Sequence, residues 1–392
     1  MNNSQHCTLA DVADLEPGLR EIRQHLHQHP ELSNLEAETA KFVASKLLSL
    51  GYEVTTGIGG FGVVGTLKQG TGGRTIGIRA DMDALPITEQ SGVSYASKTE
   101  GVMHACGHDG HTAMLLGAAE QLSRTRHFSG TVHLIFQPAE EIGFNSGAQR
   151  MLADNLFERF PCDAIYGLHN HPGYPVGKIM FRHGAFLAAC DTAKITVQGK
   201  GGHAARPQLA VDPILVASSL VMALQSVVSR NIDPNQTAVV TVGTLHAGHA
   251  SNVIPDTAYM EITIRSFDAG VRKLLEERIC SLVTSHAQGY GATAEIDYER
   301  GYPVLVNHKE ETDFAIQVAQ ELIGEENVIT DLAPISGSED FAYYLQEKPG
   351  CFLRMGNGNT ASLHHPAYDF NDQSLPFGVA YWTRLVERYL AE

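Results

Sequence analysis

Apolar runs and helix-spaced segments alternate over the first 186 residues of the chain. The spacing of apolar positions predicts a helix over residues 36–50, ended by Gly51, and another over residues 111–123. Short apolar runs between these helices predict strands at residues 62–67, 74–80, 131–137 and 163–169. Apolar strands interleaved with helices favour an α/β fold, with a mainly parallel mixed sheet that helices cover on both faces.

The middle of the chain has a different pattern. Strand, helix, strand, strand, helix and strand signals follow one another at residues 192–199, 213–228, 237–245, 258–267, 269–287 and 293–299. This order is typical of the ferredoxin-like split motif, which forms a compact α+β domain. We therefore expect such a domain over residues 188–302, inserted between two parts of a larger domain, residues 1–187 and 303–392.

The charge of the chain limits its partners. The sequence has 44 acidic and 28 basic residues, a net charge of −16, which repels nucleic acid and anionic membranes, so neither is expected as a partner. The N-terminal segment lacks the pattern of a secretory signal, and no stretch approaches the roughly 18 apolar residues of a membrane span. The expected compartment is the cytoplasm, where the six cysteines are expected to be unpaired.

Polar side chains that can bind metals follow several of the predicted strands. Asp81 and Asp83 follow one strand, Glu140 and Glu141 follow another, and His169 ends a third. Ligands bind at the carboxyl ends of the strands in an open α/β sheet. These five side chains are therefore expected to converge on one crevice.

Two further segments supply soft and nitrogen donors. The segment HACGHDGH places Cys106 and His108 just before a predicted helix, and SLHHP offers His364 and His365. Thiolate, imidazole and carboxylate are the ligands of zinc and its first-row neighbours. Each spacing alone is a weak signal, because lone histidines, glutamate pairs and buried cysteines are usually structural. The combination, with each group following an apolar run, favours a metal site.

The adjacent glutamates allow two roles for two carboxylates. If one binds a metal, its neighbour can take a proton from a water whose pKa the metal lowers from about 16 toward 7. The same carboxylate can then protonate a leaving amine. The alternative is that Cys106 acts as an acyl-enzyme nucleophile with a histidine base, which leaves the glutamate pair and His169 without a role.

Nine ordered blocks carry a resemblance over nearly the whole chain. They are LHQHPELSNLEAET at 26–39, IRADMDALPI at 78–87, HACGHDGHTAMLLGAA at 104–119, FQPAEE at 136–141, GLHNHP at 167–172, GKGGHAARP at 199–207, SNVIPD at 251–256, GSEDFA at 337–342 and LHHPAYDFND at 363–372. In these blocks the chain resembles the M20 metallopeptidase-like amidohydrolases. Within them it is similar to the branch of hippurate hydrolases, aminoacylase-like enzymes and plant auxin-conjugate hydrolases.

The resemblance implies a zinc-peptidase-like catalytic domain with a two-metal site. By motif, the ligands are Cys106, His108, Glu141, His169 and His364, with Cys106 bridging both ions. Glu140 matches the general base, and Asp81 and Asp83 match residues that orient the ligands. His365 stands next to His364 and is the alternative ligand there. Ser338, Glu339 and Asp340 lie in a family block without an assigned role.

The inserted domain resembles the lid and dimerisation domain of the family. His203 matches a histidine that reaches the site of a partner subunit and stabilises the oxyanion. Asn252 matches a position that contacts substrate, and Arg265 is a candidate clamp for the substrate carboxylate, with Arg206 as a competitor. The resemblance therefore implies a homodimer or a higher homo-oligomer.

These assignments predict a metal-dependent amidohydrolase with two divalent ions per subunit. Its expected substrates are N-acyl amino acids with an N-benzoyl, N-acetyl or indole-acyl group, cleaved to a carboxylic acid and a free amino acid. A thiolate ligand favours zinc, nickel or cobalt, and related enzymes are often manganese-loaded, so the metal stays open. The alternatives are a dipeptidase or aminopeptidase, a deacetylase of the N-acetyl-diaminopimelate type, and a catalytically silent metal-binding homologue.

Overall fold

The computed structural model describes residues 6–391 and divides the chain into two compact units. The first unit comprises Met1–Gly184, Val306–Ala333 and Asp340–Glu392, and the second comprises Ala185–Leu305 and Pro334–Glu339. Residues 1–5, part of the N-terminal segment in which no secretory signal is expected, lie outside the described residues. The strands β7 (Gly184–Leu187) and β14 (Leu305–Asn307) lie where the chain passes from one unit to the other.

An eight-stranded mixed sheet forms the centre of the first unit, in the order β1-β2-β4-β3-β5-β16-β6-β15. The bounds are β1 (Glu53–Ile58), β2 (Gly62–Gln69), β3 (Thr75–Asp81), β4 (Gly130–Gln137), β5 (Ala164–His171), β6 (Ile179–Met180), β15 (Val328–Ile329) and β16 (Gly350–Gly356). The central strands β4, β3, β5 and β16 run parallel, whereas β2 is antiparallel to β4 and β1 to β2. The carboxyl ends of the four central strands therefore meet at one edge of the sheet.

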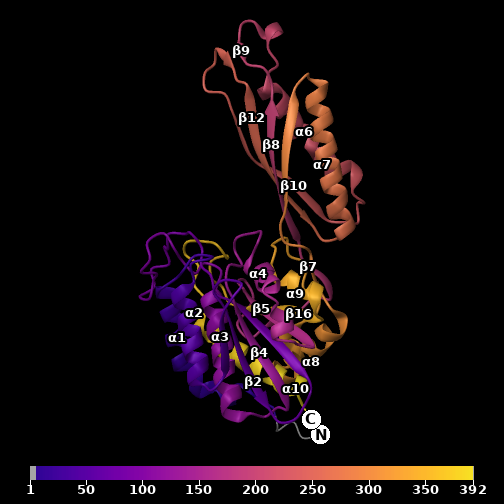
Figure 1. Ribbon diagram of the computed structural model, residues 1–392. Coiled ribbons are helices and arrows are strands. Elements are labelled where there is room, and N and C mark those ends of the chain that lie inside the picture. The colour runs from indigo at the N-terminus through magenta and orange to yellow at the C-terminus, as the bar shows by residue number, and fades with distance from the viewer. Residues whose placement is uncertain (1–5, 392) are drawn as a thin grey trace. The chain divides into compact units, whose positions relative to one another are not determined.

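Helices cover both faces of this sheet (Figure 1). One face carries α1 (Glu16–Gln28), α2 (Ala37–Ser49), α3 (His108–Thr125), α8 (Lys309–Ile323) and α10 (Leu375–Tyr389), whose apolar side chains join β3 and β4 in the main core. On the opposite face lie α4 (Gly147–Ala153), α5 (Leu156–Arg159) and α9 (Phe341–Glu347). A Cβ at Gly167 of β5 would meet Phe341, so α9 packs directly on the strand. Both faces are buried, as expected for a parallel sheet.

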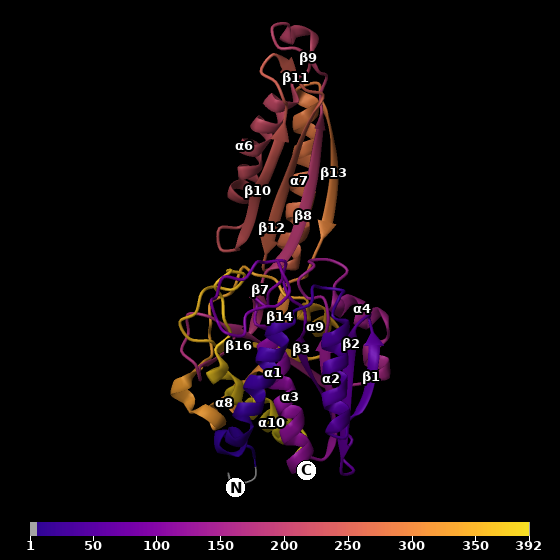
Figure 2. The ribbon, with the colours of Figure 1, turned by 90° about the vertical axis from the view of Figure 1, so that its left-hand side faces the viewer.

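The second unit is a four-stranded antiparallel sheet with two helices on one face (Figure 2). Along the chain its elements are β8 (Ala189–Gln198), α6 (Pro213–Asn231), β10 (Ala238–Ala247), β12 (Thr257–Ser266), α7 (Ala269–Gly289) and β13 (Thr293–Arg300), with the short strands β9 (Gly202–His203) and β11 (Val253–Ile254). The sheet order β10-β12-β8-β13 is that of the ferredoxin-like fold, so the predicted fold class is confirmed for both units.

Local sequence explains where several elements begin. Asp212 accepts a hydrogen bond from the backbone N–H of Ile214 (2.9 Å), and Pro213 follows it at the first helical position, so α6 begins there as predicted. Helix α3 begins three residues earlier than the predicted residue 111, after Gly107 at φ 89°. Helix α1 was not predicted, because buried Arg23 and His27 occupy core-facing places where the pattern requires apolar residues.

Helix α6 departs from one expectation. By length and composition alone it is apolar enough to cross a membrane, although no such stretch was expected from the sequence. A helix that packs in a protein core passes the same test. Here Val216, Leu220 and Leu224 of α6 are buried in the core of the second unit.

Candidate metal centre

Five side chains from distant parts of the chain converge at the carboxyl ends of the parallel strands. Cys106 and His108 stand at the start of α3, Glu141 follows β4, His169 lies in β5, and His364 lies in the loop after β16. The donor atoms of Cys106, His108 and His169 all lie within 4.8 Å of one another, as do those of Cys106, Glu141 and His364. The thiol is common to both sets, which is the geometry expected of a ligand shared by two cations.

The distances between donor atoms fit metal ligands. Cys106 Sγ lies 3.2 Å from His169 Nε2, and Glu141 Oε1 lies 3.3 Å from His364 Nε2 and 3.8 Å from His108 Nε2. Ligand atoms bound at 2.0–2.3 Å to one tetrahedral ion lie about 3.4 Å apart. The buried Nε2 of His108 makes no hydrogen bond in the described part of the chain, and a bound cation would satisfy it. The residues present therefore fit divalent ions of the zinc type.

Asp83 fixes the orientation and tautomer of His108. Its Oδ1 lies 3.2 Å from His108 Nδ1, and its Oδ2 accepts from Ser33 Oγ (2.6 Å) and from the backbone N–H of Glu141 (3.0 Å). Because Nδ1 carries the proton that Asp83 accepts, a neutral His108, the form that binds a cation, has its lone pair on Nε2, toward the other donors. One carboxylate thus holds two candidate ligands in place.

Asp81 is hydrogen-bonded to His111, and both ring nitrogens of His111 make hydrogen bonds. Its Oδ1 lies 2.6 Å from His111 Nδ1, and His111 Nε2 accepts from the backbone N–H of Asn170 (3.0 Å). Asp81, His108 and His111 also form a compact group of metal-competent atoms. Because both ring nitrogens of His111 are used in hydrogen bonds, its function here is to support Asp81 and the strand β5 rather than to offer a lone pair.

Negative charge around His108 favours a cation at this place. Burial alone would lower the pKa of His108, but the carboxylates of Asp81, Asp83 and Glu141 raise it to about 10. A site that draws a proton so strongly to a buried imidazole is one where a divalent cation is also stabilised.

Cys106 and His169 are set up as ligands that depend on a cation. Burial raises the pKa of the Cys106 thiol well above its ordinary value, and the nearby carboxylates of Glu141 and Glu140 raise it further. Burial and then Arg354 hold the pKa of His169 well below its ordinary value, so its ring stays neutral. Its Nδ1–H donates to the carbonyl of Asn170 (2.8 Å), which leaves the lone pair on Nε2 beside the thiol.

Backbone strain accompanies two residues of the site. Ala139, directly before Glu140, has φ 51°, and His364 has φ 63°, both in the left-handed region. Such a conformation costs a non-glycine residue about 1–2 kcal/mol and is found where function requires it. Glu140 itself is 6 % exposed and groups with His108 and Glu141. His365 is exposed, and its Nδ1 accepts from the backbone N–H of Ala367 (3.0 Å), outside the cluster.

A buried charge network behind the cluster was not predicted. Arg79 donates to Asp81 Oδ2 (2.6 Å), to Asp340 Oδ1 (2.9 Å) and to Gln137 Oε1 (2.9 Å). Asp340 also accepts from Gln137 and from the backbone N–H of Ala148 (3.1 Å). Asp340, to which the sequence assigned no role, therefore ties the ends of β3 and β4 to α4. The only sequence signal for it was its place in a family block.

Two of the three predicted functional residues of the second unit, His203 and Asn252, lie next to each other. Val253, next to Asn252, pairs with His203, and the backbone N–H of Ala204 donates to the carbonyl of Asn252 (3.1 Å). Arg265 lies near the other end of β12, paired with Cys190, and donates to Thr263 Oγ1 (2.6 Å). Arg206 is exposed and donates its backbone N–H to the carbonyl of His203 (2.8 Å). The competitor Arg206 is thus the arginine closer in structure to His203 and Asn252.

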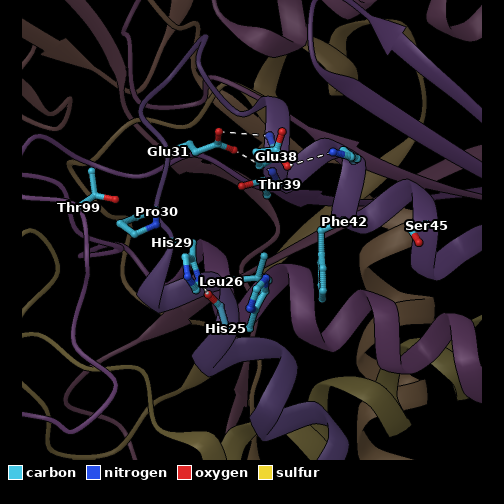
Figure 3. Close-up of a pocket in the computed structure, with 11 residues that line it drawn as sticks. His25, Leu26, His29, Pro30, Glu31, Glu38, Thr39, Phe42, Ser45 and Thr99 are labelled. Atoms are coloured by element: carbon cyan, nitrogen blue, oxygen red, sulfur yellow. Dashed lines mark hydrogen bonds and ion pairs between the residues drawn. The ribbon is translucent and has the colours of Figure 1, made fainter.

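A surface pocket of about 570 Å³ in the first unit contains none of the candidate ligands (Figure 3). It lies between α1 and α2 and is lined by His25, His29, Glu31 and Phe42 among others. The rings of His25 and Phe42 lie 4.8 Å apart, and His29 Nδ1 donates to the carbonyl of His25 (2.8 Å). These histidines are engaged in local packing, as expected from the sequence.

Comparison with known proteins gives the chain its family. Residues 77–388 match the family described as Peptidase family M20/M25/M40. The chain is 44 % identical over 382 residues to a hippurate hydrolase from Campylobacter jejuni, which covers 97 % of this chain and 99 % of that protein. It is 40 % identical over 352 residues to a thermostable carboxypeptidase from Saccharolobus solfataricus, which covers 89 % of this chain and 88 % of that protein.

A solved structure agrees with this result. A Bacillus subtilis protein described as a dinuclear metal-binding peptidase from the M20 family has a TM-score of 0.83 and 36 % identity, over 96 % of this chain and 99 % of that one. The predictions of family, fold class and amide hydrolysis are confirmed, and the coarser prediction of a metal-binding site is supported by the ligand groups. The chain belongs to the M20/M25/M40 family of peptidases and is a hydrolase that acts on amide carbon–nitrogen bonds.

Proposed function

We propose that this chain hydrolyses N-acyl amino acids to a carboxylic acid and a free amino acid, in the cytoplasm and as a homodimer, with two divalent cations per subunit. The observation that carries the proposal is the meeting of Cys106, His108, Glu141, His169 and His364 in two donor sets that share the thiol. The high identity to a hippurate hydrolase, whose name states an N-acyl amino acid substrate, supports the substrate class.

The donor set determines what the bound cations would supply. When bound, two divalent ions would polarise the acyl carbonyl and lower the pKa of the attacking water. Cys106, His108, Glu141, His169 and His364 would hold the ions, and Cys106 belongs to both groups of donor atoms. Zinc, manganese, cobalt and nickel all accept this mixture of donors.

Glu140 is the general base of the proposed reaction. Its carboxylate lies within 4.8 Å of donor atoms of His108 and Glu141, on the segment that directly follows β4. It takes a proton from the attacking water and later gives it to the departing amino group. Its burial keeps bulk water away from this proton transfer.

His203 is the oxyanion donor of the proposal, acting on the site of a partner subunit. Its Nδ1 accepts from the backbone N–H of Ala205 (3.1 Å), so its proton is on Nε2. The ring is exposed, with Nε2–H available as a donor to a developing negative charge. Asn252 beside it is the proposed contact for the substrate.

The test of the base is the variant Glu140→Gln. Turnover of hippurate or N-acetyl amino acids, measured with added manganese, cobalt or zinc, should fall by about 10²–10⁴-fold, because a glutamine side chain at this position cannot take the proton from water. Metal content, measured on the same preparations, should stay at the wild-type level. A normal kcat in this variant would remove Glu140 from the proposed role.

The substrate carboxylate clamp distinguishes two arginines. Arg206 shares the loop of His203, whereas Arg265 lies at the other end of β12. We therefore expect Arg206→Ala to raise KM for N-acyl amino acids by about 10–100-fold, and Arg265→Ala to leave KM near its wild-type value. The reverse pattern in steady-state kinetics would assign the clamp to Arg265.

Peptide hydrolysis is the second candidate, because a relative at 40 % identity is named a carboxypeptidase. The same centre would serve both reactions, so the assay compares hippurate and N-acetyl amino acids with dipeptides and with N-acetyl-diaminopimelate. A kcat/KM for dipeptides above that for every N-acyl amino acid would overturn the proposed substrate class. Loss of all turnover with full metal content would identify a silent homologue.

The alternative mechanism, in which Cys106 is the nucleophile and a histidine is its base, can be tested on the wild-type enzyme. The 3.2 Å contact between Cys106 Sγ and His169 Nε2 resembles a nucleophile with its base. The raised pKa of the thiol and the lowered pKa of the imidazole, both caused first by burial, disfavour the ion pair that such a mechanism needs. Trapping a thioester on Cys106 would establish the thiol mechanism, and its absence in a quenched reaction agrees with direct attack by water.

A further inference from the structure

The loop of residues 30–36, between α1 and α2, is fixed at both ends. The Glu31 carboxylate accepts the backbone N–H groups of Thr39 (2.8 Å) and Glu38 (3.2 Å), as Figure 3 shows, and so caps α2. Its carbonyl accepts the backbone N–H of Ala84 (2.8 Å), directly after Asp83. The loop is thereby attached to the segment that supports the metal centre.

Glu36 is at the N-cap position of α2, but its side chain does not cap the helix. Glu31 takes over that role. The side chain of Glu36 is fully buried, and its Oε1 accepts the backbone N–H of Ala139 (2.8 Å), more than 100 residues away in the chain. A buried carboxylate is costly, so this single long-range hydrogen bond is an unusual use of one.

Ala139 is clamped on both of its backbone groups. Glu36 holds its N–H, and its carbonyl accepts the N–H of Gly147 at the start of α4 (2.9 Å). A Cβ at Gly147 would lie 1.6 Å from the carbonyl oxygen of Pro138, so the two segments touch without space between them. Ala139 has φ 51°, a conformation that an alanine keeps only when its surroundings impose it.

We propose that Glu36 is a positioning residue for amide hydrolysis, which acts by holding the left-handed Ala139 peptide and thereby aiming the carboxylate of Glu140 at its place beside the ligand cluster. This inference rests on the proposed role of Glu140 as the base. Within residues 6–391 no hydrogen bond joins Glu36 to a candidate ligand, so its effect is on the geometry of the proton transfer and not on the binding of metal or substrate. A small displacement of a catalytic group costs up to about 100-fold in rate.

The chain offers a matched control for a buried carboxylate. Glu387 in α10 is also buried, and its Oε2 accepts the backbone N–H of Cys7 (2.6 Å), a residue far away in the chain. The pKa of each carboxyl is raised to about 7, with burial as the largest cause. Replacing either residue therefore removes a similar buried group, but only Glu36 adjoins the segment that carries Glu140.

The experiment compares Glu36→Leu and Glu36→Gln with Glu387→Leu, at saturating metal. Glu36→Leu keeps the side-chain volume and removes the acceptor, so kcat should fall by about 10–100-fold while KM and metal content stay within about threefold. Glu36→Gln keeps an acceptor oxygen for Ala139 and should restore kcat to within about threefold. Glu387→Leu should lower the melting temperature without the loss of kcat.

The outcomes separate this inference from the proposed function. If wild-type enzyme is active and Glu140→Gln is inactive, but Glu36→Leu has normal kcat, the positioning role is wrong and the base stands. A loss of metal, a change in KM alone, or an equal loss of kcat in Glu387→Leu would also overturn the inference. If Glu36→Leu does not fold, Glu36→Asp, which withdraws the carboxylate from Ala139, should lower kcat by about tenfold, and an unchanged kcat there overturns it.

Discussion

His364 shows how one residue of this site combines an unfavourable backbone with a useful side chain. Its φ of 63° places Nε2 3.3 Å from Glu141 Oε1, and its backbone N–H donates to the carbonyl of Ala105 (2.8 Å), next to Cys106. The strain turns the side chain toward the donor cluster, whereas the following residue, His365, points into its own turn. Replacing each of the two histidines in turn therefore tests which of them is the metal ligand.

We expect His364→Ala to lose metal affinity by more than the about 10–100-fold that loss of a residue supporting a ligand costs, and to lose turnover with it, because one of the five candidate ligands is removed. His365→Ala should bind metal and turn over substrate within about threefold of wild type. Metal titration monitored by activity, with metal content measured after dialysis, checks both. If His365→Ala is the variant that loses metal, the ligand is His365 and the loop must rearrange when metal binds.

At the scale of elements, hydrophobic patterning predicted α2, α3, α6 and α7 and most of the buried strands, because their apolar positions repeat at 3.6 or 2 residues or run continuously. It did not predict α1, and it gave no bounds for α8, α10 or β16. It missed the two-residue strands β6 and β15, which are too short for any period. It also gave no sign that residues 334–339 belong to the second compact unit. Short edge strands, and the compact unit to which a segment belongs, depend on long-range contacts, which leave no periodic signal in the sequence.

The candidate site was predictable for the same reason that the strands were. Asp81, Glu141 and His169 follow or end apolar runs, and the carboxyl ends of parallel strands meet at one edge. The support residues were not predictable from pattern alone. Arg79 meets Asp340 across 261 positions, and Glu36 meets Ala139 across 103 positions, so neither contact is visible before the chain folds.

Helix α6 and strand β10 leave apolar surface unpaired in the second unit. Leu215 is 56 % and Met222 73 % exposed, one heptad apart on the same side of α6. Strand β10 is at the edge of the sheet, with no strand on its outer side in residues 6–391. Unpaired edge strands and exposed apolar stripes are surfaces that a second copy can cover.

The double variant Leu215→Glu/Met222→Glu should therefore convert the proposed homodimer to a monomer, since it would place two charges in the apolar interface. Both side chains are exposed in the single chain, so its fold should persist. Leu48→Glu, at a 61 % exposed leucine of α2 in the first unit, is the matched control and should leave the dimer intact. Light scattering after size exclusion measures the mass. A monomeric wild type, or a dimeric double variant, would contradict this interface.

At the scale of the whole molecule, the first unit is assembled from both ends of the chain. Near the start of the described residues, the backbone N–H of Cys7 donates to Glu387 Oε2 in the C-terminal helix α10, and its carbonyl accepts from Arg384 Nη1 (3.1 Å). Glu387 is buried and its pKa is raised from 4.5 to about 7, with burial as the largest cause. Because this contact joins the two ends of the first unit, the stability of the unit depends in part on whether Glu387 is protonated.

The sign of that dependence follows from proton linkage. Between pH 4.5 and 7 the unfolded chain ionises Glu387 while the folded protein keeps it protonated, so this group's contribution to stability falls as pH rises, by up to about 3 kcal/mol, and is constant above. Glu387→Gln keeps an acceptor for Cys7 and does not titrate. Its melting temperature relative to wild type should therefore increase from pH 5 to pH 8 in differential scanning fluorimetry. Titrating groups that do not contact Glu387 are shared by the two proteins and cancel in the difference, whereas His6, whose Nδ1 lies 4.0 Å from Glu387 Oε2, does not cancel. If the melting temperatures of the variant and the wild type changed by the same amount between pH 5 and pH 8, Glu387 would ionise in the folded protein at its ordinary pKa, and the prediction would be wrong.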